Sequence, residues 1–226
     1  MCGRVGFYDD AGWSKAILAH YGHYNNLVGD LLPSYNIAPS QPMATLLNSG
    51  DYTYTHFGLI PHWAKETKFQ PINARAETIA SKPTFKSSFS TRRCLIPVNG
   101  FYEWYKAGNH KIPYWITPSS SDFFALAGIY DEWHDPASDE TIISSAIITT
   151  SPTGVMEPIH DRMPVILNPD DWKLWLDPKV TEPEAVAPLL SPCRDDLMHA
   201  YEVSTYVNSP SNNDEKCIAQ MSSFLF

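Results

Sequence analysis

The sequence has few cysteines and no long apolar run. Its four cysteines stand at positions 2, 94, 193 and 217, without the short paired spacing of a zinc knuckle or a disulfide framework. No stretch approaches the ~20 apolar residues that a membrane-spanning helix needs. The first twenty residues carry charges and no continuous apolar run, which argues against a signal peptide. We therefore expect a soluble protein of the reducing cytoplasm, associated with the nucleoid if the chain is prokaryotic, and without contact to a membrane.

The sequence also lacks histidines or cysteines at the spacing typical of metal ligands. The eight histidines form no HxxxH or HxH pair, and such pairs are what place two imidazoles on one face of a helix or strand. The isolated cysteines do not supply the missing ligands. We expect no metal and no other cofactor.

Strand patterns dominate what is present. Short runs rich in β-branched and aromatic residues lie between turn residues at about 2–8, 42–47, 52–60, 92–98, 101–106, 111–117, 123–133 and 141–150. The AGNH stretch between two of these runs indicates a hairpin. Helices are expected only over residues 12–21, 74–81, 169–176 and 182–190. Because long helices do not alternate with the strands, we expect an α+β, strand-rich fold, an antiparallel barrel or packed sheets with a few short peripheral helices, in one domain over residues 1–226.

Negative charge prevails, but unevenly. The net charge is -9, which taken alone argues against a polyanionic partner. Between positions 62 and 93, however, seven Lys or Arg face two acids, whereas from position 131 onward 17 acids face five bases. Each stretch could simply be a solvated face. The alternative is a basic groove for phosphates on an otherwise acidic body.

Four polar residues stand where a strand-rich core would not need them, namely Cys2, Asn73, Glu103 and His160. Cys2 is either a small buried residue or, once Met1 is trimmed, a nucleophile with a free amine beside its thiol. Glu103 lies among aromatic residues that could desolvate it, or it faces outward from a strand. His160 lies on an irregular segment and is either a general acid or base or an ordinary loop histidine.

Three arginines lie close in sequence to these positions: Arg4, Arg75 and Arg162. Guanidinium groups are the preferred partners of phosphate oxygens. Ion pairs with Glu77 or Asp161 are an equally good explanation for any single arginine. The choice between the two stays open at this point.

Seven sequence blocks together resemble one known family. They read MCGR at 1–4, YNIAP at 35–39, FGLIPHW at 57–63, INARAET at 72–78, RRCLIPVNGFYEW at 92–104, IHDRMPVIL at 159–167 and EVSTYVNSPSNN at 202–213. In content and order these blocks resemble the SOS response-associated peptidase (SRAP) family, over nearly the whole chain. Two features depart from the expected pattern. Tyr201 precedes Glu202-Val203-Ser204 where the family commonly has a histidine, so we assign Tyr201 no catalytic role, and the acidic total weakens long-range steering toward DNA.

The resemblance implies a protein that processes abasic sites in single-stranded DNA. It implies that Cys2, after removal of Met1, forms a thiazolidine crosslink with the ring-opened abasic sugar and shields the lesion. By the same resemblance Asn73, Glu103 and His160 complete the catalytic site, and DNA is contacted by Arg4, Trp63, Arg75 and Arg162, with Asn36 and Pro39 lining the groove. Associated lyase and self-processing peptidase activities follow from the same chemistry, and a monomer suffices for them.

Two other functions remain open from the residues alone. One is an N-terminal-nucleophile cysteine peptidase or amidase that uses Cys2 with His160. The other is a non-catalytic module that binds single-stranded nucleic acid and in which Cys2 is structural. Crosslinking to an abasic oligonucleotide separates both from the first.

Overall fold

The computed structural model describes residues 2–221, and strands prevail in it. The strands are β1 (Val5–Phe7), β2 (Asn25–Asn26), β3 (Ser34–Ile37), β4 (Pro42–Leu47), β5 (Asp51–Phe57), β6 (Asn73–Arg75), β7 (Arg93–Val98), β8 (Gly100–Ala107), β9 (His110–Pro118), β10 (Phe124–His134), β11 (Thr141–Thr150), β12 (Met163–Pro164) and β13 (Met198–Glu202). The α-helices are short: α1 (Ala11–Ala16), α2 (Pro83–Thr91), α3 (Trp172–Trp175) and α4 (Pro183–Val186). The expected α+β, strand-rich fold with few short helices is confirmed.

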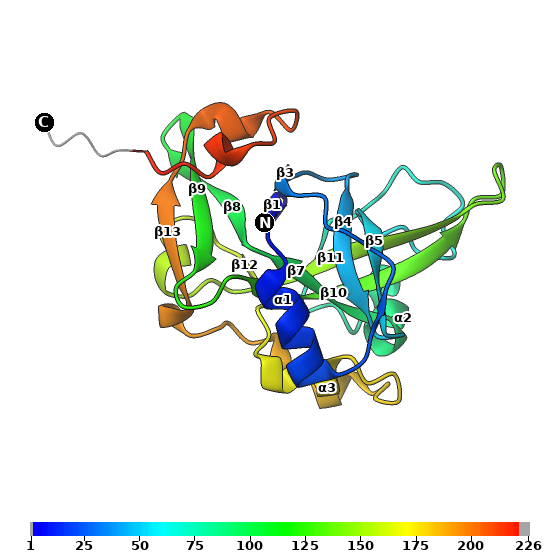
Figure 1. Ribbon diagram of the computed structural model, residues 1–226. Coiled ribbons are helices and arrows are strands. Elements are labelled where there is room, and N and C mark those ends of the chain that lie inside the picture. Colours follow the sequence, from blue (N-terminus) through cyan, green and yellow to red (C-terminus); the bar gives the residue numbers. More distant parts are fainter. Residues whose placement is uncertain (1, 222–226) are drawn as a thin grey trace, which may run out of the picture.

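The larger sheet closes on itself. Its strands follow the order β12-β11-β10-β7-β4-β5-β2, and β6 also pairs with β11. In addition β11 runs parallel to β5, with Ser144 opposite His56 and Ser145 opposite Phe57. This contact joins β11, β10, β7, β4 and β5 into a closed ring, which forms the right-hand part of the molecule in Figure 1. The sequence left a barrel or packed sheets open, and the larger sheet forms a barrel that a parallel strand pair closes.

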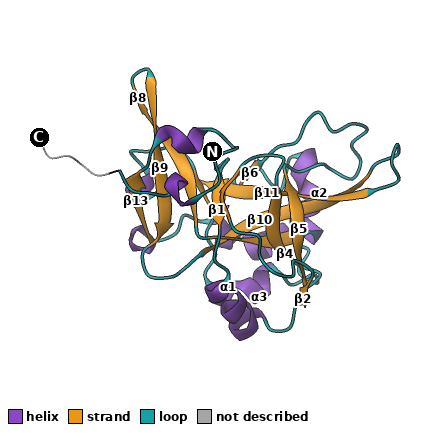
Figure 2. Cartoon of the chain, turned by 45° about the horizontal axis from the view of Figure 1, so that its top comes forward, coloured by secondary structure: helices purple, strands orange, loops and turns teal. Residues whose placement is uncertain are grey.

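A second sheet, with the order β13-β9-β8-β1-β3, lies beside the barrel (Figure 2). Strand β1 runs antiparallel to both its neighbours, with Val5 opposite Phe101 of β8 and opposite Ile37 of β3. The N-terminal residues thus lie where the two sheets meet. The chain passes from β7 of the barrel directly into β8 through Gly100, where an added Cβ would lie 2.4 Å from the Trp115 ring. One domain over residues 1–226 stays a prediction.

Tryptophans pack beneath the barrel, against the short helices. Trp13 of α1 and Trp172 of α3 are fully buried, with ring centroids 5.2 Å apart. Trp175, one turn further along α3, is also buried, and its ring nitrogen donates to the Cys94 carbonyl of β7 at 2.9 Å. Aromatic burial of this kind fixes α1 and α3 to the end of the barrel. The expected helices over 12–21, 169–176 and 182–190 are confirmed, each as a short α-helix adjoining a turn of other helical geometry.

One expected helix is wrong. Residues 74–81 contain good helix formers, yet Asn73–Arg75 form β6, which pairs in parallel with β11 from Ile147 onward. The helix α2 begins only at Pro83. Strand pairing here overrides helix propensity, since Ala74 pairs with Ile148 of β11 and its side chain is fully buried in the core. This error matters for the site, because the strand is what carries Asn73.

The hairpin expected at AGNH is confirmed. Strands β8 and β9 pair from Phe101 opposite Ile116 to Ala107 opposite His110, and Gly108 in the turn has φ of +60°, which favours glycine. Within residues 2–221 the structure contains no helix that is long and apolar enough to cross a membrane.

Candidate active site

Cys2 lies alongside β8. The Tyr102 backbone N–H donates to the Arg4 carbonyl at 2.9 Å, so the residues before β1 continue the pairing with β8 and bring Cys2 beside Glu103. The Cys2 side chain is fully buried. Burial raises the pKa of its thiol far above the ordinary value, and the negative charge of Glu103 raises it further. The thiol is therefore neutral at pH 7.

Asn73 holds the backbone of Cys2 through a hydrogen bond. Its Nδ2 donates to the Cys2 carbonyl at 3.0 Å and lies 3.4 Å from the Ile147 carbonyl of β11. Its Oδ1 is buried and accepts no hydrogen bond from any residue that the structure describes. Burying an acceptor without a partner costs about 1–3 kcal/mol. An oxygen in this position is suited to accept a hydrogen bond from a bound molecule.

Glu103 and His160 form a close acid and base pair. Glu103 in β8 is 3% exposed, and its Oε2 lies 3.9 Å from Nε2 of His160. His160 follows a helical turn and is anchored by its backbone N–H, which donates to the Met156 carbonyl at 2.9 Å. The side chains thus come from β8 and from the loop before β12, which lie far apart in the sequence.

The second ring nitrogen of His160 has two competing partners. Nδ1 lies 2.8 Å from Oδ1 of Asp161 and 3.1 Å from the backbone N–H of Arg162. It can donate to the carboxylate or accept from the N–H, but not both at once. When it accepts, the ring proton is on Nε2 and points toward Glu103. The ring can therefore change its protonated nitrogen without moving, which suits a proton shuttle.

A cavity of 360 Å³ opens onto this pair. It is lined by Glu103, Trp104, Lys106, Lys111, His160 and Asn208. A neighbouring cavity of 440 Å³ shares Trp104, Lys106 and His160 with it and adds the acidic residues Glu157 and Asp161. The site is thus open to a ligand on the side of the β8–β9 hairpin.

Arg4 and Asn36 hold the C-terminal segment against β1. Arg4 donates through Nη1 to Oδ1 of Asn36 at 2.7 Å and to the Val207 carbonyl at 2.8 Å, and its guanidinium lies over the Trp104 ring at 5.8 Å. Burial lowers the pKa of Arg4. Asn36 is 1% exposed and donates to the carbonyls of Val207, Ser209 and Asn212. A direct DNA contact by Asn36 stays a prediction, and these bonds let it also act by positioning Arg4.

Arg162 forms the ion pair that the sequence offered as an alternative. Its two terminal nitrogens contact the Glu77 carboxylate at 2.7 and 2.9 Å, and Nη2 also donates to the Thr149 carbonyl at 2.6 Å. The hydrogen bond from Arg162 lowers the pKa of Glu77. Arg75, at the end of β6, is exposed. A phosphate at Arg162 would have to share this guanidinium with Glu77, whereas Arg75 is open to solvent.

Known proteins match this chain over most of its length. The family model described as SOS response associated peptidase (SRAP) matches residues 1–210. The chain is 46% identical over 196 residues to the abasic site processing protein YoqW of Bacillus subtilis, across 84% of this chain and 87% of that protein. The chain belongs to the SRAP family. The resemblance seen in its sequence blocks is confirmed.

More distant matches are similar to this SRAP chain in sequence or in fold. The abasic site processing protein HMCES of Xenopus tropicalis is 31% identical over 222 residues, across 83% of this chain and 66% of that protein. A crystal structure of a Bacteroides thetaiotaomicron protein, 29% identical, superposes with a TM-score of 0.87 and covers 98% of this chain and 100% of that one. The strand-rich fold described above is therefore shared by a solved structure.

The exposed Trp63 of this SRAP chain stands on a loop that a buried carboxylate anchors. Asp131, 2% exposed, accepts from the backbone N–H of His62 and lies 3.0 Å from its ring Nδ1. Its other oxygen lies 3.1 Å from Nε of Arg92. Trp63 is 56% exposed and Pro39 is also exposed. The basic stretch at 62–93 is only partly a surface groove, since Arg92 pairs with Asp131 and Arg93 is fully buried.

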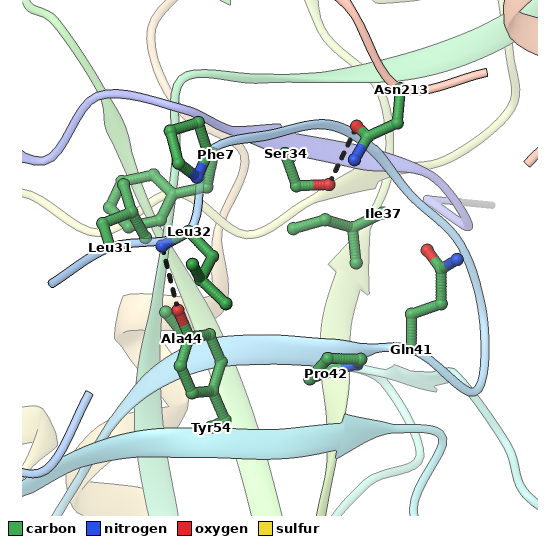
Figure 3. Close-up of a pocket in the computed structure, with 11 residues that line it drawn as sticks. Phe7, Leu31, Leu32, Ser34, Ile37, Gln41, Pro42, Ala44, Tyr54 and Asn213 are labelled. Atoms are coloured by element: carbon green, nitrogen blue, oxygen red, sulfur yellow. Dashed lines mark hydrogen bonds between the residues drawn. The ribbon is translucent and has the colours of Figure 1, made fainter. Parts of the chain in front are cut away.

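Another cavity, of 380 Å³, is mainly apolar (Figure 3), and its described lining includes none of the four candidate catalytic residues. Its lining is mainly aliphatic and aromatic, and it includes Leu32, Ile37 and Tyr54. The Tyr54 hydroxyl accepts from the Leu32 backbone N–H at 3.3 Å, and Ser34 donates to Asn213 at 3.1 Å. None of the described residues that line it is an acid, a lysine or a histidine, so proton-transfer chemistry is better placed at Glu103 and His160.

Sequence reasoning missed four residues of the site: Trp104, Lys106, Lys111 and Asn208. The first three lie on one hairpin, and the alternation of side chains along β8 places Trp104 and Lys106 on the same face. The sequence pattern therefore contained a signal for these residues. Asn208 accepts from the Trp104 ring nitrogen at 2.8 Å, and nothing in the sequence indicates that contact. Residues 2–221 contain no cluster of metal-ligating side chains.

Proposed function

We propose that this SRAP chain processes abasic sites in single-stranded DNA through a covalent bond between Cys2 and the ring-opened abasic sugar. The proposal rests on one observation: four residues from separate segments of the chain lie close together. They are Cys2, Asn73, Glu103 and His160. Its similarity to proteins named abasic site processing protein supports the choice of substrate.

The reaction needs a free amine on Cys2, and therefore removal of Met1, which lies outside the described residues. The amine adds to the sugar aldehyde and one water leaves, which gives a Schiff base. The Cys2 sulfur then bonds to the imine carbon, and the thiol proton ends on the nitrogen. The product is a thiazolidine ring, formed without oxidant or reductant. Because the thiol is held neutral, the amine reacts first and the sulfur closes the ring.

Three neighbours direct these steps. Glu103 holds the amine by its charge and can accept the thiol proton. His160 protonates the sugar ring oxygen during opening and then moves protons between the intermediates, as its two competing Nδ1 partners allow. The Oδ1 atom of Asn73 accepts a hydrogen bond from the reacting hydroxyl or amine.

The DNA strand is held by cations and an aromatic ring. Arg4, Arg75 and Arg162 contact phosphates, and Trp63 stacks on a base, as single-stranded DNA-binding proteins commonly do. Asn36 and Pro39 shape the groove. One monomer in the cytoplasm supplies all of these groups. Affinity is modest because the protein as a whole is acidic, and it falls with salt because cation–phosphate contacts release counterions from the DNA.

Two further activities follow from the same intermediate and site. The Schiff base permits β-elimination, which would cleave the strand as a lyase does. Self-processing would remove Met1 by attack at the bond before Cys2. An N-terminal-nucleophile cysteine peptidase or amidase is the alternative, and the raised pKa of the Cys2 thiol weighs against it, since a cysteine nucleophile reacts as the thiolate.

The proposal is tested with a single-stranded oligonucleotide that carries one abasic site. After incubation with the protein, a denaturing gel should show a shifted band that depends on Cys2 and is missing with undamaged DNA. The Cys2→Ala protein is the matched control. Reversible binding without a covalent band would instead support a non-catalytic binding module.

A further inference from the structure

Two lysines face each other across the β8–β9 hairpin. Lys106 and Lys111 are directly opposite in the antiparallel register, so both side chains project from the same face. Both are exposed, and neither forms an ion pair with any residue among 2–221. Like charges directly opposite each other destabilise a sheet. Proteins tolerate such local costs mainly at functional sites, so this pair indicates an anion.

The surroundings of the pair indicate where the anion lies. Both lysines line the 360 Å³ cavity together with Glu103 and His160, and Glu103 is the single acid among its described lining residues. The neighbouring 440 Å³ cavity has Lys106 alone, opposed by Glu157 and Asp161. A negatively charged group is thus favoured in the first cavity and disfavoured in the second.

The same wall offers a flat aromatic surface. Trp104 lies two residues before Lys106, on the same face of β8, and its ring nitrogen is fixed by Asn208. The Arg4 guanidinium lies over this ring. The hairpin stands out from the rest of its sheet (Figure 2), which leaves its lysines accessible to a strand passing over it.

We propose that Lys106 and Lys111 together bind one backbone phosphate next to the abasic residue and so position the sugar at Cys2. This inference rests on the proposed function. A sugar held at Glu103 and His160 carries its own flanking phosphates, which places one of them in the cavity that the lysines line. A lysine ammonium group acts as a point charge, which suits the binding of a backbone phosphate without recognition of the base sequence.

Salt dependence of reversible binding tests the pair first. The probe is a single-stranded oligonucleotide with a tetrahydrofuran abasic analogue, which has no aldehyde and cannot crosslink. The variant is Lys106→Gln/Lys111→Gln. The control Lys15→Gln/Lys173→Gln removes the same charge from exposed positions on α1 and α3 at the other end of the molecule (Figure 1). Loss of one phosphate contact should reduce the slope of log K against log salt by about 0.7 in the variant and leave it unchanged in the control.

Neutral phosphates then locate the contact. Methylphosphonate linkages are introduced one at a time on either side of the analogue. One of them should weaken binding by the unmutated protein and have no further effect on the Lys106→Gln/Lys111→Gln protein. The inference is overturned if that variant keeps the control's salt slope, or if every methylphosphonate penalty persists in it. Crosslinking of the unmutated protein to aldehyde-bearing DNA is measured in parallel, so failure of the proposed function shows separately as loss of that band.

Discussion

The Nε2 atom of His160 lies 3.9 Å from Oε2 of Glu103, and both residues line the 360 Å³ cavity. The distance is too long for a hydrogen bond and short enough for one to form after a small shift. A ligand or a free amine between the two groups can contact both. In the proposed reaction we assign this pair the roles of acid and base.

Removing either member of this pair should slow crosslinking. General acid and base groups contribute about 10²–10⁴-fold to rates, so His160→Ala and Glu103→Gln should each lower the crosslinking rate at pH 7 by about 10²-fold or more. His134→Ala is the matched control, because His134 pairs with the exposed Asp139 on the β10–β11 hairpin and neither residue lines the cavity. Quenched time courses on a denaturing gel give the rates. Unmutated rates in the His160 and Glu103 variants would show the roles assigned to them to be wrong.

Asn73→Ala should lower the rate while leaving the fold intact. The change removes a buried Oδ1 acceptor and the hydrogen bond to the Cys2 carbonyl. Hydrogen-bond losses of about 1–3 kcal/mol correspond to a rate about 5- to 150-fold slower. Ser81→Ala, which removes a local hydrogen bond on the turn after β6, serves as a control. If crosslinking is unchanged in Asn73→Ala, its oxygen takes no part in the reaction.

The reactivity of Cys2 should depend steeply on pH. Burial and Glu103 raise the pKa of the thiol, so the neutral form persists well above pH 8.5 and the reactive thiolate grows about tenfold with each pH unit. In protein that retains Met1, alkylation of Cys2 by iodoacetamide should rise throughout pH 7–9 without a plateau. Peptide mapping distinguishes Cys2 from Cys193, whose pKa burial raises to about 11. A plateau near pH 7 would mean that the thiol is activated.

Arg93 contributes to stability and not to DNA binding. It is fully buried and donates to five backbone carbonyls, those of Phe89, Ser90, Trp175, Asp177 and Val180. Arg93→Met leaves these acceptors unsatisfied and should lower the free energy of unfolding by about 3–5 kcal/mol. Arg194→Met, at an exposed ion pair, should change it by about 1 kcal/mol or less. Urea denaturation of both proteins measures the difference, and equal effects would contradict the structural role.

Much of the fold follows from local patterns. The runs at 42–47 and 141–150 coincide with β4 and β11 because turn residues flank an apolar run in the first and a β-branched run in the second. The closure of the barrel does not follow, since it depends on the parallel contact between β11 and β5. Asn73 shows the same limit, because its segment has helix-forming residues and only pairing with β11 makes it a strand.

The candidate site was recognisable mainly through the family blocks. Composition and spacing leave Cys2, Glu103 and His160 as single polar residues with ordinary alternatives, and their proximity depends on β1, β8 and the loop before β12 meeting in space. The sequence also did not indicate which lysine and arginine side chains are exposed and which are buried. Arg93 lies in the basic stretch, yet it is buried, while Lys106 and Lys111 lie outside that stretch and line the cavity.

The most direct test is the mass of the crosslinked product. The protein is incubated with a single-stranded oligonucleotide containing one abasic site, digested with a protease, and the DNA-bearing peptide is analysed by mass spectrometry. We predict a peptide that begins at Cys2, lacks Met1, and has the summed mass of peptide and oligonucleotide less one water. A DNA-bearing peptide that retains Met1, or one joined through another residue, would contradict the account.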